Sequence, residues 1–373
     1  MNLVSKKLAI QWGLGGACAL TLCAGVMPAA TAGPGAISAF HAAAFTQGAA
    51  DKTSGDGEYA FKVLFTSSHL PAEAQAVLEK AHGGFGIDIR EGQGEIYFAL
   101  PGAGIIQISK DLKSTKMIPT PDDIKNNNMH NTMFWQAPSG TPYLSFPAND
   151  TAKILTAGLD GTLANTLDAP AGFDFDEPVV NAYFAAGEKF VPTDVEYLDG
   201  RFYITTGYSK LDYVLTATVR EDGGIHSEWH DLAFGGKGDG AGQFGTGHGV
   251  TIAPDGKHLA IADRPNSEIE FFTRYGRFLE KVDMPKGSLP CDVDFEAGYM
   301  LVGCLEGPNK EVGAPIYLVK DNQVVSTVII REELGLEKFA HIHNAALREI
   351  NGKLYIIAQA WNPGDFAILE QVK

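Results

Sequence analysis

One short phrase recurs six times along the chain. In each copy a variable residue precedes Gly, Asn or Asp, and alternating apolar positions follow. The copies begin at Phe85, His130, Thr193, His248, Cys291 and His343, so successive copies start 43 to 63 residues apart. Each copy is followed by a turn and a second strand-like run, and usually by two further strand candidates. Self-similarity of this kind restricts the chain to a repeat architecture.

Six repeated four-stranded sheets predict an all-β fold, a six-bladed β-propeller in which the first strand of each blade lines a central channel. The last repeat ends short of strands, whereas the run from Tyr59 to Ser68 belongs to no blade. We expect this N-terminal strand to complete the last blade, because closing the ring removes two exposed sheet edges.

The ends of the chain divide it into three parts. Lys6 and Lys7 precede an apolar stretch that ends in Ala30-Thr31-Ala32, so residues 1–32 are predicted to be a cleaved signal peptide. Residues 33–57 are expected to be a flexible, Ala- and Gly-rich lead-in, and residues 58–373 the propeller. A membrane anchor is the alternative, but Gln11 and several glycines interrupt the apolar run. We therefore expect a periplasmic or secreted monomer without a membrane anchor.

Charge narrows the choice of partners. The chain carries 45 acidic and 29 basic residues, a formal net charge of −16. Such acidity argues against binding to nucleic acid or anionic lipid. The expected partner is a small-molecule or peptide substrate.

Two cysteines follow the predicted signal peptide, Cys291 and Cys304. They flank a predicted hairpin that turns near Ala297-Gly298, so they would face each other across antiparallel strands. Export to an oxidising compartment favours a disulfide between them. Two free thiols are the alternative, because cross-strand geometry is not ideal for the bond.

Histidine occupies the first position of the phrase in blades two, four and six: His130, His248 and His343. Alternate blades of a six-fold ring stand about 120° apart, so three imidazoles would point at the channel axis. A tetrahedral metal uses three protein ligands in this way and keeps its fourth direction open. The alternative is that each histidine packs separately and bonds a backbone carbonyl. His341 replaces His343 if the strand register differs.

An open fourth position is typical of a catalytic metal, at which a water or substrate oxygen is polarised. Three neutral nitrogen ligands make Zn²⁺ the first expectation. Copper, nickel and iron also bind imidazole.

Several segments resemble a known family. "GQFGTGHGVTIAP" followed by "LAIADRPNSEIEFF" is similar to an NHL repeat, and more particularly to the catalytic core of peptidyl-α-hydroxyglycine α-amidating lyase, a six-bladed propeller with a three-histidine zinc site. "VPTDVEYLDGRFYITTGY" and "HIHNAALREINGKLYIIAQA" carry the likeness in blades three and six. Over the rest of residues 85–373 the resemblance is weak.

The resemblance implies roles for individual residues. His130, His248 and His343 match the zinc ligands, Tyr208 matches the base that acts on the substrate hydroxyl, and Arg264 matches an arginine of the same pocket. The family's reaction breaks a C–N bond and releases an amide and glyoxylate.

Two departures from the family stand out. The "HRGDH" segment of its first blade, which carries an arginine, is replaced by "YFALPG", so an anchor for the substrate carboxylate is missing. Asn344 stands where an aspartate of a channel Ca²⁺ site is expected, which argues against calcium and points to a different substrate.

Loops after each second strand are expected to form the channel mouth, and they carry Tyr208, Arg264, Glu306 and Trp361. Tyr208 beside a metal and an arginine would ionise more readily than usual, and Arg264 could hold a carboxylate or a developing oxyanion. Trp361 and Glu306 are the predicted substrate-binding residues. Packing of Tyr208 and pairing of Arg264 with Asp263 are the structural alternatives.

The function favoured by these residues is a metal-dependent lyase that acts on a small polar or peptide-derived hydroxylated substrate. The same open site would also serve a metal-dependent hydrolase or a copper redox enzyme. The non-enzymatic alternative is a binding propeller, which presents a rim to a protein or carries metal.

Overall fold

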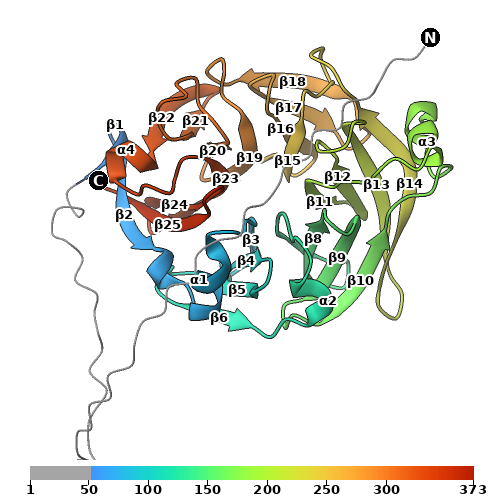
Figure 1. The fold of residues 1–373 in the computed structure, drawn as a ribbon, viewed down its shortest axis with the longest axis horizontal. Helices are drawn as coiled ribbons and strands as arrows, with labels where there is room; N and C mark the ends of the chain where they lie inside the picture. The colour runs from blue at the N-terminus through green and yellow to red at the C-terminus, as the bar shows by residue number, and fades with distance from the viewer. Residues whose placement is uncertain (1–51) are drawn as a thin grey trace, which may run out of the picture. The chain divides into compact units, whose positions relative to one another are not determined.

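The structure is a computed structural model that describes residues 52–373. These residues form six antiparallel sheets arranged in a ring around a central channel (Figure 1). The six-bladed β-propeller predicted from the repeated phrase is confirmed. The predicted signal peptide, residues 1–32, and most of the expected lead-in lie outside the described residues.

Blades one to five each consist of four strands in chain order, numbered from the channel outward. They are: blade one, β3 (Phe85–Ile87), β4 (Ile96–Leu100), β5 (Gly104–Ile108) and β6 (Thr115–Ile118); blade two, β7 (Met133–Gln136), β8 (Pro142–Ala148), β9 (Lys153–Gly158) and β10 (Leu163–Asp168); blade three, β11 (Asp194–Leu198), β12 (Arg201–Thr205), β13 (Tyr213–Glu221) and β14 (Ile225–Gly235); blade four, β15 (Gly247–Ile252), β16 (His258–Asp263), β17 (Glu268–Thr273) and β18 (Phe278–Asp283); blade five, β19 (Pro290–Glu296), β20 (Tyr299–Cys304), β21 (Pro315–Lys320) and β22 (Gln323–Ile329).

Blade six joins the two ends of the described chain. Its inner strands are β23 (Ile342–Ile350), β24 (Lys353–Ala360) and β25 (Asp365–Gln371), and β2 (Tyr59–Thr66) pairs antiparallel with β25. The expected closure by an N-terminal strand is therefore confirmed. In Figure 1 the blue β2 lies directly beside the red β25.

A fifth strand, β1 (Ser54–Asp56), extends blade six beyond β2. It falls within residues 33–57, which were expected to lack regular structure, so the end of that range is corrected. The strand forms because the neighbouring blade offers it partners: the amide of Ile329 donates to Ser54 Oγ at 2.7 Å, and the amide of Asp56 donates to Ser326 Oγ at 2.9 Å. Through these bonds, the outer edge strand of blade six finds hydrogen-bonding partners in blade five.

Alternating side chains of each strand fill two different cores between blades. In β4, Ile96, Phe98 and Leu100 pack toward blade six, whereas Tyr97 and Ala99 pack toward blade two, and all five are buried. The period of two along the strand therefore supplies apolar surface to both neighbouring interfaces.

Short helices connect some of the blades, and within residues 52–373 none is long and apolar enough to cross a membrane. They are η1 (Ser67–His69), α1 (Ala72–Leu78), α2 (Asp122–Lys125), α3 (Pro178–Ala185) and α4 (Ile330–Leu334). Helix α1 buries Ala74 and Leu78 against blade one and leads the chain from β2 to the channel. The segment that follows it, 81–84, enters the channel.

Polar side chains near the channel connect several neighbouring blades. Asp194 accepts from the amide of Val250 at 2.9 Å, and Asn344 Oδ1 accepts from the amide of Phe85 at 3.2 Å. In both cases a residue at the second position of one phrase accepts an amide of the next blade. Val250 is at the third position of its phrase, so Phe85 is at the third position of the blade-one phrase as well. The sequence assignment of Phe85 to the first position was wrong, because this side chain belongs to an apolar core and Gly83 takes the channel position.

Candidate metal centre

Bulges aim the key side chains into the channel. Strand pairing shifts by one residue at the start of the inner strand in blades four, five and six, at His248, Cys291 and His343. An extra residue in one strand bends it locally and redirects a side chain. Glycine is required beside His248, because a Cβ on Gly249 would lie 2.5 Å from an oxygen of Asp292.

The three predicted ligands share one hydrogen-bonding arrangement. The Nδ1 atoms of His130, His248 and His343 lie 2.7, 2.7 and 2.9 Å from the backbone carbonyls of Thr193, Cys291 and Gly83. Since a carbonyl only accepts, each Nδ1 carries the proton and donates. The Nε2 atom of each neutral ring is then unprotonated and carries the lone pair that a metal ligand requires.

Two of these lone pairs face each other. The Nε2 atoms of His130 and His343 are 3.2 Å apart, and both rings are buried. Burial lowers the pKa of both imidazoles well below 6.5, so neither ring holds a second proton to share. Ligand nitrogens at the usual zinc distance of about 2.0–2.1 Å stand about 3.3 Å apart in a tetrahedron. The observed spacing therefore fits a shared metal ion.

His248 lies beside this pair, and its Nε2 faces a hydroxyl. The centroid of its ring is 4.9 Å from that of His130 and 5.4 Å from that of His343. The Tyr208 hydroxyl is 3.0 Å from His248 Nε2, and because Nδ1 holds the ring proton, the hydroxyl donates. Burial lowers the pKa of His248 as well.

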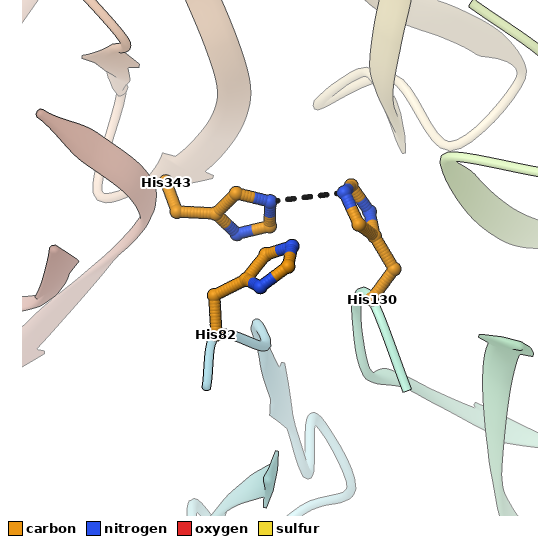
Figure 2. Close-up of side chains that lie close together, drawn as sticks. All are labelled: His82, His130 and His343. Atoms are coloured by element: carbon orange, nitrogen blue, oxygen red, sulfur yellow. Dashed lines mark hydrogen bonds between the residues drawn. The ribbon is translucent and has the colours of Figure 1, made fainter. Parts of the chain in front are cut away.

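A fourth imidazole, which the sequence reasoning missed, reaches the same point. His82 has its ring centroid 4.9 Å from that of His130 and 4.4 Å from that of His343. Ligand atoms of His82, His130 and His343 all lie within 4.8 Å of one another, and Figure 2 shows one ring nitrogen of His82 turned toward the gap between the other two. Burial lowers the pKa of His82 to about 4, so the ring is neutral near pH 7.

A sequence signal for His82 existed in "AHGGF". It was overlooked because the blade-one phrase was aligned on Phe85. Aligned on Gly83 instead, the phrase puts His82 one residue before a channel position. The pair His130–His343 thus has two neighbours, His82 and His248. His82 completes a cluster of converging ligand atoms with this pair, whereas His248 adjoins the pair with its Nε2 turned to the Tyr208 hydroxyl.

Tyr208 and Arg264, the two predicted catalytic residues, lie beside His248. Arg264 Nη1 donates to the Tyr208 oxygen at 3.0 Å, and the guanidinium carbon lies 5.4 Å from the centre of the ring. Burial raises the pKa of Tyr208 and Arg264 partly offsets this, so the easier ionisation expected from the sequence does not follow from these residues alone.

Among residues 52–373, no carboxylate pairs with the buried Arg264 side chain. Its side chain is 7% exposed, its Nε has no hydrogen-bond partner among the described residues, and its contacts are Tyr208 and Cys291. The suggested pairing with Asp263 is not formed, because that carboxylate accepts from the amides of Gly245 and Thr246. An uncompensated buried guanidinium favours an anionic ligand.

The expected disulfide is absent: both Cys291 and Cys304 are free and buried. The bulge turns Cys291 toward the channel, where its Sγ lies 3.0 Å from Arg264 Nη2. Cys304 instead packs in an apolar core with Met284 and Tyr317. The two side chains diverge because the extra residue breaks the cross-strand pairing that the hairpin prediction assumed.

The two predicted substrate-binding residues lie in different surroundings. The Trp361 ring packs against His82, with centroids 4.0 Å apart and the ring planes tilted by 42°, and so forms part of the site. Glu306 forms an ion pair of 2.8 Å with Lys310, and both side chains are partly exposed. No contact within the described part of the chain joins Glu306 to the four histidines.

A cavity of about 380 Å³ occupies another level of the channel. Its lining contains amides and carboxylates from the second and later positions of the phrases: Asn131, Asp194, Glu196, Asp292, Asp294, Glu296 and Asn344. None of the four histidines lines it. The candidate metal centre and this cavity are therefore separate regions of the channel.

No protein-family model matches the chain, and no curated protein matches its sequence. Virginiamycin B lyase from Staphylococcus aureus, in a catalytically inactive form with quinupristin, is 15% identical over 79% of this chain and 81% of its own, with a TM-score of 0.45. A nidogen/laminin complex chain is 11% identical over 79% and 96%, with a TM-score of 0.48. Likenesses this distant carry no functional argument, so the resemblance to the amidating lyase depends on sequence motifs alone.

Proposed function

We propose that the chain is a metal-dependent lyase whose zinc ion is held by His130, His248 and His343. The observation that supports this best is the shared orientation of the three rings, each with Nδ1 bonded to a carbonyl of the next blade. Neutral imidazoles whose tautomer is fixed in this way suit zinc, copper, nickel or iron. Zinc is proposed because a lyase needs a Lewis acid and no redox change.

Each residue around the centre has a proposed role in the cleavage of a C–N bond. A bound zinc would polarise the substrate hydroxyl and favour the ionised form of Tyr208. Tyr208 is proposed to take the hydroxyl proton and return it to the leaving nitrogen. Arg264 holds the Tyr208 oxygen through Nη1, and its positive charge beside the centre favours an anionic group of the substrate. Trp361 forms an aromatic wall beside His82.

Two measurements test this proposal. Metal analysis of protein prepared without added metal should find about one zinc per chain. The zinc-loaded protein should release aldehyde and amide from a panel of N-acyl α-hydroxy amides, with and without a carboxylate. Tyr208→Phe should lower the rate by about 10²–10⁴-fold, the usual contribution of a general acid or base.

The matched control is Tyr275→Phe, since Tyr275 is 63% exposed. It should leave the rate unchanged. Full activity of metal-loaded Tyr208→Phe would contradict the catalytic assignment, and products of hydrolysis or oxidation would point to the other enzyme classes.

A metal carrier without turnover is the second candidate. It is favoured by the presence of His82, because four imidazoles would close the coordination sphere and closed four-ligand sites are typical of non-catalytic zinc. A carrier would hand its zinc to an acceptor chelator and would leave every substrate of the panel intact.

A further inference from the structure

We propose that His82 is a displaceable fourth metal ligand: its imidazole completes the coordination in the resting protein and leaves when a substrate oxygen binds. The inference rests on the proposed metal centre and adds the group that opens it. A site closed by four imidazoles has no position for substrate, so one of the four must depart.

His82 is in position to bind. Its ring makes edge-on contacts with the rings of His130 and His343, which are the pair whose Nε2 atoms face each other. Ligand atoms of these three residues already lie within 4.8 Å of one another. In Figure 2 the three side chains enter from separate segments and converge on one point.

His82 is also the ring that is least restrained. The other three imidazoles are each held by a hydrogen bond from Nδ1 to a backbone carbonyl. No hydrogen bond to either ring nitrogen of His82 is formed within residues 52–373, and its ring is held by aromatic contacts with Trp361, His130 and His343. It is less deeply buried than the other three. A ring held only by aromatic contacts can rotate away without leaving a hydrogen-bonding partner unsatisfied.

The backbone beneath His82 is fixed, so the departure would be a side-chain rotation. The carbonyl of Gly83 accepts from His343 Nδ1, and the amide of Gly83 donates to Gln359 at 3.2 Å. Neither glycine after His82 tolerates a side chain: a Cβ on Gly83 would lie 2.0 Å from the carbonyl oxygen of Ala99, and one on Gly84 1.6 Å from an oxygen of Asn131. The tight packing of Gly83 and Gly84 fixes the backbone of His82 next to the proposed metal, while no hydrogen bond fixes its ring.

The test counts imidazole ligands directly. X-ray absorption spectra of the zinc-loaded full chain should show four imidazoles in the wild type, and three imidazoles plus one oxygen in His82→Ala. His82→Asn repeats the measurement with a polar side chain, and circular dichroism confirms that each variant is folded. His341→Ala is the control, because the ring of His341 bonds the carbonyl of Leu305 instead, and it should keep four imidazoles.

Azide binding to the cobalt-loaded protein, followed by visible absorption, tests displacement. Azide should bind at least 10-fold more tightly to His82→Ala than to the wild type, because no imidazole has to leave, and His341→Ala should match the wild type. Three imidazoles in the wild type, or equal azide affinity in wild type and His82→Ala, would overturn the role of His82 while the three-histidine centre stands. Failure of the wild type to bind zinc would overturn both proposals.

Discussion

The channel contains two neighbouring levels that use polar side chains in opposite ways. At the first level, His130, His248 and His343 donate from Nδ1 to the backbone and turn an unprotonated Nε2 away from it. At the second level, Asp194 and Asn344 use their oxygens to accept backbone amides of the next blade. Adjacent residues of one strand can therefore have different roles. A histidine whose Nδ1 bonds a backbone carbonyl keeps Nε2 for metal binding, whereas an Asp or Asn whose oxygen accepts a backbone amide holds neighbouring blades together.

The largest effect is expected at the first level. His343→Ala should weaken zinc binding by more than 100-fold, because it removes a ligand, and even partners outside the ligand shell cost about 10–100-fold. Competition with a fluorescent chelator measures the affinity. Unchanged zinc affinity in folded His343→Ala would contradict the assignment of metal binding to the level of the histidines.

At the second level the effect should fall on stability instead. Asp194→Ala leaves the buried amide of Val250 without its acceptor, which costs about 1–3 kcal/mol of unfolding free energy. Denaturant unfolding of the metal-free protein measures this loss. Zinc affinity should stay within a few-fold of the wild type, and a collapse of zinc affinity at normal stability would show that Asp194 belongs to the metal site.

Glu196, a carboxylate of the second level, should make the free energy of unfolding depend on pH. Burial raises the pKa of Glu196 to about 8 from 4.5. The unfolded chain therefore loses this proton at lower pH than the folded protein, and stability decreases as pH rises from about 4.5 through 8. Glu196→Gln should become more stable relative to the wild type over this interval, by about 2 kcal/mol after allowance for the open cavity beside it.

Unfolding at pH 5 and pH 8 for both proteins gives the comparison. A constant difference between them would show that Glu196 ionises normally. Zinc binding should not change between Glu196→Gln and the wild type at pH 8, since the level of the histidines is left intact.

The smallest effect is expected for Cys291→Ser. Cys291 holds the same bulged position as His248 and His343, but its contribution to the centre is a backbone carbonyl, which the variant keeps. Serine also offers Arg264 an acceptor. Zinc affinity should change less than two-fold in the chelator assay, and a large loss would identify the thiol as a ligand.

The sequence predicts the ring and its closure because repeats and edge strands follow from local patterns that each blade carries by itself. His130, His248 and His343 could be chosen because they recur at equivalent positions. Tyr208 and Arg264 were found through motif resemblance, and the structure places both beside His248.

What the sequence could not predict depends on single-residue shifts. The bulge at Cys291 separates it from Cys304, and alternation alone does not reveal a bulge. A two-residue misalignment in blade one hid His82, because a core phenylalanine fitted the apolar pattern equally well. Glu306 was predicted to bind substrate because its loop was expected at the channel mouth. Its carboxylate instead forms an ion pair with Lys310, which the loop position alone does not reveal.

The most direct test of the central claim is an anomalous diffraction experiment on crystals of the zinc-loaded protein, collected on both sides of the zinc absorption edge. The account predicts one strong peak in the channel, about 2.0–2.1 Å from the Nε2 atoms of His130, His248 and His343. A peak bound only by the carboxylates of the second level, or no peak among the imidazoles, would contradict it.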